Sequence, residues 1–178
     1  MFKNILVFML FVSAVFGCLP AWAATIQGPP DTQGSQFNTS GERIGRLRLG
    51  LPEKDVGRSI PCRPKKGKEL SEAATGEYVQ MWKYAECGIV LKMSSDRRGG
   101  AKVVASILVT SRCKLVTGKG IHIGSTESEV IRVYGRYGDQ EGNTKKGKRF
   151  VAGSIYDGMV FDFKGGRGVG IFLGAGAE

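Results

Sequence analysis

Two stretches of this sequence occur twice, and an internal repeat restricts the chain to folds built from two similar units. Residues 47–56, LRLGLPEKDV, align without a gap on residues 121–130, IHIGSTESEV, at an offset of 74 (121 minus 47). Residues 88–93, GIVLKM, align on residues 158–163, GMVFDF, at an offset of 70 (158 minus 88). The repeat therefore predicts two copies of one supersecondary unit, with a shorter loop in the second copy.

The first 23 residues resemble a secretory signal peptide. Lys3 supplies a positive start, residues 5–16 form an apolar run too short to span a bilayer, and residues 21–23 fit a small-x-small cleavage site. Residues 15–18, VFGC, also resemble a bacterial lipobox, in which Cys18 would be acylated. We expect a periplasmic or secreted protein after cleavage near Ala23, with a lipid anchor in the envelope as the alternative.

The charge of the remaining chain indicates the kind of partner it would attract. Of 26 Lys and Arg residues only Lys3 lies in the predicted signal, which leaves 25 basic against 16 acidic residues, a balance of +9. A basic surface attracts anionic partners, such as an acidic protein, anionic lipid headgroups or cell-wall polymers. Nucleic acid is not expected as a partner of an exported chain.

Three cysteines follow the predicted signal, and an oxidising compartment favours one disulfide among them. If Gly99-Gly100 is a two-residue hairpin turn, the numbers of residues that pair across it sum to 199. Because 87 plus 113 is 200, we favour a disulfide between Cys87 and Cys113 with Cys62 free. A bond between Cys62 and Cys87 remains possible, since spacing along the chain does not give distances.

Composition divides the rest of the chain into an arm and two units. Residues 24–43 are rich in Gly, Pro, Ser, Thr, Gln and Asn and predict a mobile arm. The first repeat unit is expected over residues 44–116 and the second over residues 117–178.

Each unit is predicted to contain one short helix followed by strands. Thr126 and Glu129 form a capping-box pattern at the start of a helix that Gly135 ends, and Pro52 marks the first turn of the corresponding helix in the first unit. Strands are predicted over residues 78–84, 89–93 and 103–110, and over residues 149–156, 159–163 and 168–173.

Alternation along the strands predicts which side chains face the core. Because Asp162 suits solvent better than the core, Phe161 and Phe163 should face the helix and Asp162 the opposite side. The aligned positions place Leu91 in the core and Lys92 on the opposite side. The predicted fold class is α+β, with two tandem helix-plus-antiparallel-sheet units that form one curved sheet, helices on one face and an exposed concave face on the other.

The repeat resembles a known unit. Residues 120–135 and 156–163 resemble the unit of beta-lactamase inhibitor protein and, more distantly, of the BamE/SmpA-type envelope lipoproteins. In the first copy, residues 82–84 before Gly88, and the bridge at residues 117–119, resemble tandem forms of that unit. The resemblance implies a non-enzymatic protein that grips another protein with a concave sheet and its loops. It does not imply a beta-lactamase as the target.

The candidate binding residues are of two kinds. Aromatic residues can anchor a protein interface, although the strand face that carries Tyr78, Trp82 and Tyr84 could instead belong to the core. The predicted partner-binding residues are Tyr78, Trp82, Tyr84, Lys92, Tyr156 and Asp162.

Two identical Lys-Lys-Gly-Lys tetrapeptides are each predicted to lie in the loop between a helix and the first strand after it. They could form one cationic patch, or they could be solvated loops that maintain solubility. The residues of these basic loops are Lys65, Lys66, Lys68, Lys145, Lys146, Lys148 and Arg149.

No motif predicts a catalytic, metal or cofactor site. His122 lies between two isoleucines without a fixed nucleophile, and the Ser-x-x-Lys pattern at residues 111–114 follows a strand rather than starting a helix. We therefore expect no enzyme, no cofactor and no metal, and an exported inhibitor or immunity-type protein that occludes an enzyme or toxin. The alternative is a structural envelope protein that binds anionic membrane or cell wall through its basic loops.

Overall fold

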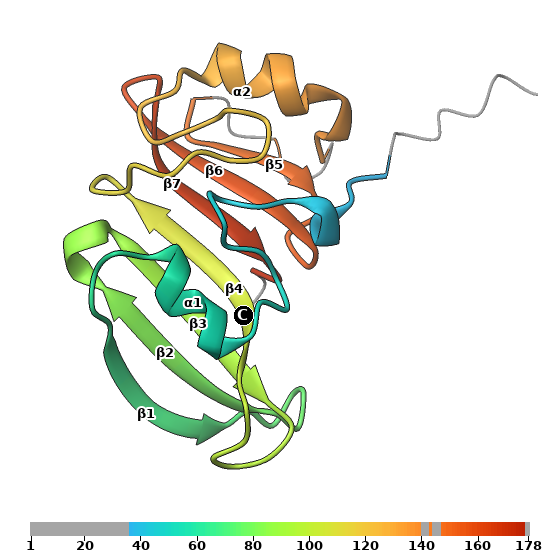
Figure 1. The fold of residues 1–178 in the computed structure, drawn as a ribbon. Helices are drawn as coiled ribbons and strands as arrows, with labels where there is room; N and C mark the ends of the chain where they lie inside the picture. The colour runs from blue at the N-terminus through green and yellow to red at the C-terminus, as the bar shows by residue number, and fades with distance from the viewer. Residues whose placement is uncertain (1–35, 140–142, 144–146, 177–178) are drawn as a thin grey trace, which may run out of the picture. The chain divides into compact units, whose positions relative to one another are not determined.

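The computed structural model describes residues 36–139, 143 and 147–176, which belong to one compact unit, Gln33–Glu178. This part of the chain is an α+β fold, with a seven-stranded antiparallel sheet in the order β1-β2-β3-β4-β7-β6-β5 and two α-helices (Figure 1). The elements are α1 (Glu53–Ser59), β1 (Lys65–Ser71), β2 (Tyr78–Tyr84), β3 (Ile89–Ser95), β4 (Val103–Thr110), α2 (Glu127–Tyr134), β5 (Arg149–Gly153), β6 (Gly158–Lys164) and β7 (Arg167–Gly174). Three 3₁₀ turns join them: η1 (Thr39–Gly41), η2 (Ala85–Cys87) and η3 (Gly135–Tyr137).

The hydrophobic core lies between one face of the sheet and the two helices. A row of buried side chains crosses this face from strand to strand, because each is the register partner of the next: Trp82, Leu91, Ile107, Leu173, Met159 and Ala152. Val56 of α1 and both Val130 and Tyr134 of α2 belong to the same cluster. The Tyr134 ring lies 5.0 Å from that of Phe161, so α2 packs directly on β6.

The start of each helix follows from local sequence. Thr126 accepts a hydrogen bond from the Glu129 backbone N–H at 3.2 Å, and the Thr126 N–H donates to the Glu129 carboxylate at 2.7 Å, which confirms the predicted capping box of α2. Gly135 caps the other end of α2, as predicted. Pro52 is the N-cap of α1, one position before the first helical residue. The sequence had predicted it at the first helical position instead.

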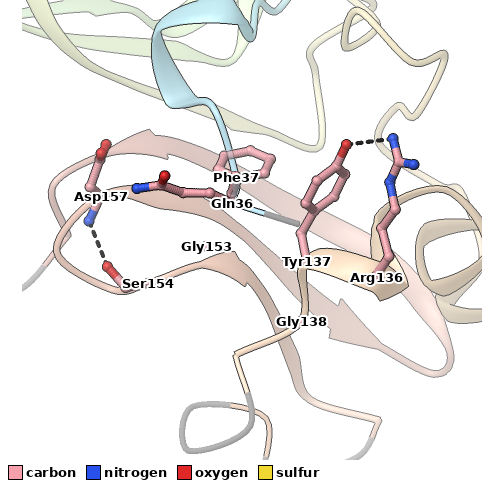
Figure 2. Close-up of a pocket in the computed structure, with 8 residues that line it drawn as sticks. All are labelled: Gln36, Phe37, Arg136, Tyr137, Gly138, Gly153, Ser154 and Asp157. Atoms are coloured by element: carbon pink, nitrogen blue, oxygen red, sulfur yellow. Dashed lines mark hydrogen bonds between the residues drawn. The ribbon is translucent and has the colours of Figure 1, made fainter. Parts of the chain in front are cut away.

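The segment before α1 is part of the fold from Gln36 onward. The Phe37 ring lies 5.5 Å from the Tyr137 ring in an edge-on arrangement (Figure 2). Thr39 and Glu42 are buried. The predicted mobile arm, residues 24–43, is therefore too long at its C-terminal end, because aromatic packing orders residues that composition alone assigns to an arm. Residues 24–35 and the predicted signal peptide lie outside the described residues.

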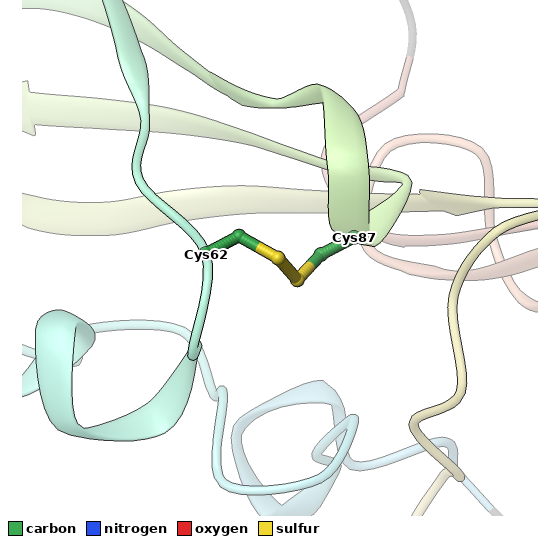
Figure 3. Close-up of a disulfide and its surroundings, with 2 residues drawn as sticks. All are labelled: Cys62 and Cys87. Atoms are coloured by element: carbon green, nitrogen blue, oxygen red, sulfur yellow. A yellow bond between two sulfur atoms is a disulfide. The ribbon is translucent and has the colours of Figure 1, made fainter.

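The disulfide joins Cys62 to Cys87, and Cys113 is a buried free thiol (Figure 3). Our preferred pairing of Cys87 with Cys113 is wrong, and the alternative pairing is the one observed. The reason is the register of the β3–β4 hairpin, in which Ile89 pairs with Val109, so the paired numbers sum to 198 rather than 199. A bulge after Lys92 shifts the register further toward the turn.

Among the described residues, no helix has both the length and the apolar composition needed to cross a membrane. The bond between Cys62 and Cys87 is compatible with an oxidising compartment.

Candidate functional site

The sheet face opposite the helices, called the open face below, carries a continuous apolar row. The row consists of Val90, Leu108, Phe172 and Val160, one from each of the adjacent strands β3, β4, β7 and β6. Each is the register partner of the next, and cross-strand partners in antiparallel sheets lie about 4.5–5.5 Å apart. Val90, Leu108 and Phe172 are partly exposed. Val160 is only 9% exposed, so the accessible part of this apolar stripe spans the three strands β3, β4 and β7.

Two hollows lie along this apolar row and share Phe172. The larger, about 460 Å³, is lined by Met81, Lys92 and Ser106 together with Phe172 and the end of β1. The smaller, about 220 Å³, is lined by Leu108 and Val160 on the other side of Phe172. Side chains from a second surface could enter both hollows on either side of one aromatic ring.

The chain itself covers part of the smaller hollow. The Gly176 N–H donates to the Ile155 carbonyl at 2.7 Å, which holds the segment after β7 beside the β5–β6 turn. Both residues line the smaller hollow. The larger hollow is flanked by Met81, which is 40% exposed, and by Leu70, which is 61% exposed.

Two charged residues of the open face, Lys92 and Asp162, have partners within the molecule. Lys83, the register partner of Val90, is exposed on the same face and takes part in no ion pair among the described residues. The Lys92 ammonium lies 2.6 Å from the Glu72 carboxylate, and the Arg149 Nε lies 2.7 Å from the Asp162 carboxylate. The bond to Asp162 raises the pKa of Arg149. Lys92 and Asp162 therefore face away from the core, as alternation predicted, but their charges are largely compensated. A partner bound here would meet apolar side chains framed by ion pairs.

Two of the predicted aromatic anchors are core residues. Trp82 and Tyr84 are 4% and 1% exposed, because they lie on the face of β2 that the core covers. Burial raises the pKa of Tyr84 to about 12. Neither side chain can contact a partner without unfolding this part of the sheet, which corrects their assignment to the binding site. The alternative that the strand face belongs to the core is the observed one.

The other two predicted aromatic residues remain accessible. Tyr78 lies on the same face of β2 as Trp82, but at the end of the strand, where it is half-buried. Tyr156 is 70% exposed in the turn between β5 and β6. Tyr156 is thus placed beside Ile155, at the border of the smaller hollow.

The described parts of the two basic segments lie at opposite edges of the sheet. Lys65, Lys66 and Lys68 lie on β1 rather than in a loop. Arg149 is the first residue of β5, and Lys148 lies in the turn directly before it. Since β1 and β5 are the two outer strands, six strand spacings of about 4.8 Å separate them, a distance of about 29 Å. Lys145 and Lys146 lie outside the described residues.

Lys66 contacts a core residue of the neighbouring strand β2. Its ammonium lies 3.6 Å from the centroid of the Trp82 ring and covers the outer edge of the core with a cation–π contact. The Trp82 indole N–H donates to the Gln80 side chain at 2.8 Å. Lys65 and Lys68 are exposed.

A polar hollow of about 400 Å³ lies between the N-terminal segment and the β5–β6 turn. Figure 2 shows Arg136 at one end of it and Asp157 at the other, with Phe37 and Tyr137 between them. Arg136 donates to the Tyr137 hydroxyl at 2.6 Å, and the Asp157 N–H donates to the Ser154 hydroxyl at 3.0 Å. The sequence did not predict this hollow, which depends on the position of the N-terminal segment.

The residues considered for catalysis have no catalytic neighbours in the described structure. His122 is exposed, and its Nδ1 lies 2.8 Å from the Ile123 carbonyl oxygen. Burial raises the pKa of the Cys113 thiol, which disfavours the nucleophilic thiolate. Among the described residues, no group of three His, Cys, Asp or Glu side chains has a geometry suited to a metal ion.

Sequence reasoning placed Val90 and Val160 on the open side but did not identify the apolar row. Leu108 and Phe172 become neighbours only through the pairing of β4 with β7, which alternation within single strands does not determine. Apolar residues on the solvent side of two predicted strands were the available signal.

No protein-family model, no curated protein and no solved structure matches this chain. The resemblance to beta-lactamase inhibitor protein and to the BamE/SmpA-type lipoproteins therefore stays a prediction from the residues that carry it.

Proposed function

We propose that this chain is an exported, non-enzymatic protein-binding module that covers part of an enzyme or toxin with the open face of its sheet. The single observation that carries the proposal is the apolar row of Val90, Leu108, Phe172 and Val160 on a face that neither helix of the described residues covers. Contiguous exposed apolar surface is a mark of protein interaction sites. The hollows on either side of Phe172 would receive side chains of the partner.

The charges suggest how such a partner would be selected. Lys92 and Asp162 are already paired on the open face, so affinity there would come mainly from apolar contact. The excess positive charge of the chain, which includes Lys83 beside Val90 on the open face, would increase the association rate of a partner with an acidic surface. In many protein interfaces, apolar contacts supply most of the binding affinity and charged residues increase the association rate.

We propose further that the sheet consists of two tandem copies of one unit. The backbone N–H groups of Gly50 and Gly124, which the repeat aligns, donate to Val104 and Gly168 at 2.8 Å each. In turn, the backbone N–H groups of Val104 and Gly168 donate to the carbonyls of the residues after those glycines, Leu51 at 3.0 Å and Ser125 at 2.8 Å.

A second correspondence lies within the strands. The β3–β4 ladder has a bulge between Lys92 and Met93, and the β6–β7 ladder has one between Asp162 and Phe163, at the same offset of 70 (162 minus 92). Bulges are specific local features, so their agreement favours duplication. A duplicated unit joined through β4 and β7 would give one wide face, larger than either copy could offer alone.

Capture of a partner from a periplasmic extract tests the proposal when it is compared between matched variants. Phe172→Glu places a charge in the middle of the apolar row, and Ile131→Glu places the same charge on an exposed apolar position of α2. We expect the wild type and Ile131→Glu to retain the same protein, identified by mass spectrometry, and Phe172→Glu to lose it. Equal capture by all three, or recovery of only lipid or glycan, would refute the proposal.

The alternative function is attachment to an anionic membrane or cell wall through the basic segments. Its supporting observation is that Lys65 and Lys68 are exposed on the edge strand β1, and no ion pair involves them among the described residues. Replacing all six lysines of the two tetrapeptides should then abolish co-sedimentation with anionic vesicles. If the six replacements leave sedimentation unchanged, this alternative is wrong.

A further inference from the structure

A separate apolar pocket lies away from the open face, beside the disulfide. Its volume is about 240 Å³, and three segments form its walls: Pro61 after α1, Cys87 and Ile89 around the start of β3, and Cys113 and Leu115 after β4. Figure 3 shows that Cys62 and Cys87 come from two different segments, the coil after α1 and the turn η2. The pocket is therefore a junction of chain segments rather than a groove on one element.

The walls are held together without a ligand. The bond between Cys62 and Cys87 links the first two walls covalently. The third wall is fixed to the second, since the Thr110 N–H donates to the Gly88 carbonyl at 2.9 Å. A Cβ atom at Gly88 would lie 2.9 Å from the Cys113 nitrogen, so the two backbones are in direct contact there. A preformed pocket loses little conformational entropy when it is filled.

The rim of this pocket is basic. Arg112 and Lys114 line it, and among the residues that the structure describes Glu86 is the only acidic one that does so. Leu115 packs against Gly45, whose N–H donates to the Val116 carbonyl at 2.7 Å, and this brings the 43–46 segment beside the rim.

That neighbouring segment is also basic, although its arginines do not line the pocket. Arg43 and Arg46 are exposed, as are Arg112 and Lys114. Among the described residues, none of the four takes part in an ion pair. The segments 43–48 and 111–123 contain no acidic residue. The pocket therefore combines an apolar interior with a border on which the cationic Arg112 and Lys114 outnumber the one acidic lining residue, Glu86.

We propose that this pocket is a second contact point for the protein partner, and that it accepts one apolar side chain from an acidic segment of that partner. Pockets for drug-sized molecules usually measure about 300–1,000 Å³, whereas the volume here, about 240 Å³, suits a single large side chain. Carboxylates on either side of the apolar residue would pair with Arg112 and Lys114. The inference rests on the proposed protein-binding function and specifies the chemistry of the partner.

A peptide titration followed by amide NMR on the mature chain tests this assignment without the natural partner. The probe has one leucine between two pairs of glutamates, and the control peptides replace the leucine by glycine or all glutamates by lysines. We expect the probe to shift the amides of Gly88, Cys113 and Leu115, the glycine peptide to bind at least tenfold more weakly, and the lysine peptide not to bind. Equal binding of the glycine peptide, or shifts confined to Leu108 and Phe172, would overturn the assignment.

Charge reversal at the rim provides the second test. Arg112→Glu with Lys114→Glu should weaken binding of the probe at least tenfold, whereas Arg132→Glu with Lys164→Glu, on α2 and at the end of β6, should leave it unchanged. Saturable binding of decanoate at the pocket without peptide binding would replace the protein segment by a lipid and overturn the proposal.

The two proposals fail separately. If the probe does not bind but capture still depends on Phe172, only the pocket assignment is wrong. If the probe binds as expected but capture does not depend on Phe172, the proposed role of the open face is wrong.

Discussion

Removing the disulfide should cost a defined amount of stability. We consider the double variant Cys62→Ala with Cys87→Ala, which opens a loop with a sequence separation of 25. The chain-entropy relation for a loop of this length gives an entropy change of about −12 cal/mol/K in the unfolded state, or about 3.5 kcal/mol at 25 °C. Both cysteines are only partly buried against the core, and alanine keeps their β-carbons, so the loop term should dominate.

Thermal unfolding measures this loss. For a folded region of this size, 1 kcal/mol corresponds to about 2–4 °C, so the variant should melt about 7–14 °C below the wild type. Adding a reductant should lower the Tm of the wild type by a similar amount. The double variant should not respond to the reductant, because no disulfide remains in it.

Single variants distinguish the observed pairing from the competing one. A bond between Cys87 and Cys113 would close a loop of nearly equal length, so the size of the loss cannot separate the two. The Tm of the Cys113→Ala variant should still fall when reductant is added, because Cys113 is a free thiol in the wild type and its removal leaves the disulfide intact. If Cys113→Ala melts like the reduced protein while Cys62→Ala stays sensitive to reductant, the pairing with Cys62 and the reasoning from it are refuted.

Three further predictions concern the core and the second helix. Thr126→Ala removes the N-cap of α2 and should lower the free energy of unfolding in urea by about 1 kcal/mol, whereas the exposed Ser128→Ala should not. Phe161→Ala removes the ring against Tyr134 and should cost about 3–5 kcal/mol in the same assay, and a loss below 1 kcal/mol would contradict the packing. Hydrogen bonding to Thr126 lowers the pKa of Glu129, so this carboxylate stabilises the fold above its unfolded-state pKa, and the contribution disappears as pH falls. Glu129→Gln should therefore reduce the loss of unfolding free energy between pH 5 and pH 3. The same loss in the variant as in the wild type over this pH range would contradict the prediction.

The regular elements were largely predictable from local signals. Residues 78–84 and 103–110 were predicted as strands and are β2 and β4 with the same bounds. The capping box at Thr126 identified α2, because its two reciprocal bonds depend only on residues three positions apart. Alternation was sufficient where one charged residue, Asp162, decided which face was solvated.

Features that depend on register were not predictable in the same way. β1 carries lysines and no alternating apolar pattern, since an edge strand outside the core has little to bury, so its sequence was assigned to a loop. The disulfide assignment was wrong because a bulge and a longer turn altered the β3–β4 pairing by one or two positions.

In the candidate site too, features that depend on alternation within one strand were predictable, and features that depend on strand pairing were not. The outward orientation of Lys92 followed from alternation, whereas the apolar row needed the contact of β4 with β7, two strands far apart in the chain. Trp82 was assigned to an interface because aromatic residues serve interfaces and cores equally well. Whether Trp82 serves the core or an interface depends on which face of the sheet the helices cover.

Oxidation of methionine in the captured complex tests most directly whether the open face binds the partner. Met81 is 40% exposed beside the larger hollow, whereas Met93 and Met159 are fully buried and serve as internal references. Under mild peroxide, Met81 should oxidise readily in the free protein and at least fivefold more slowly in the complex, while the two buried methionines stay unmodified in both. An unchanged rate at Met81 in a complex whose formation is otherwise established would contradict binding through the open face.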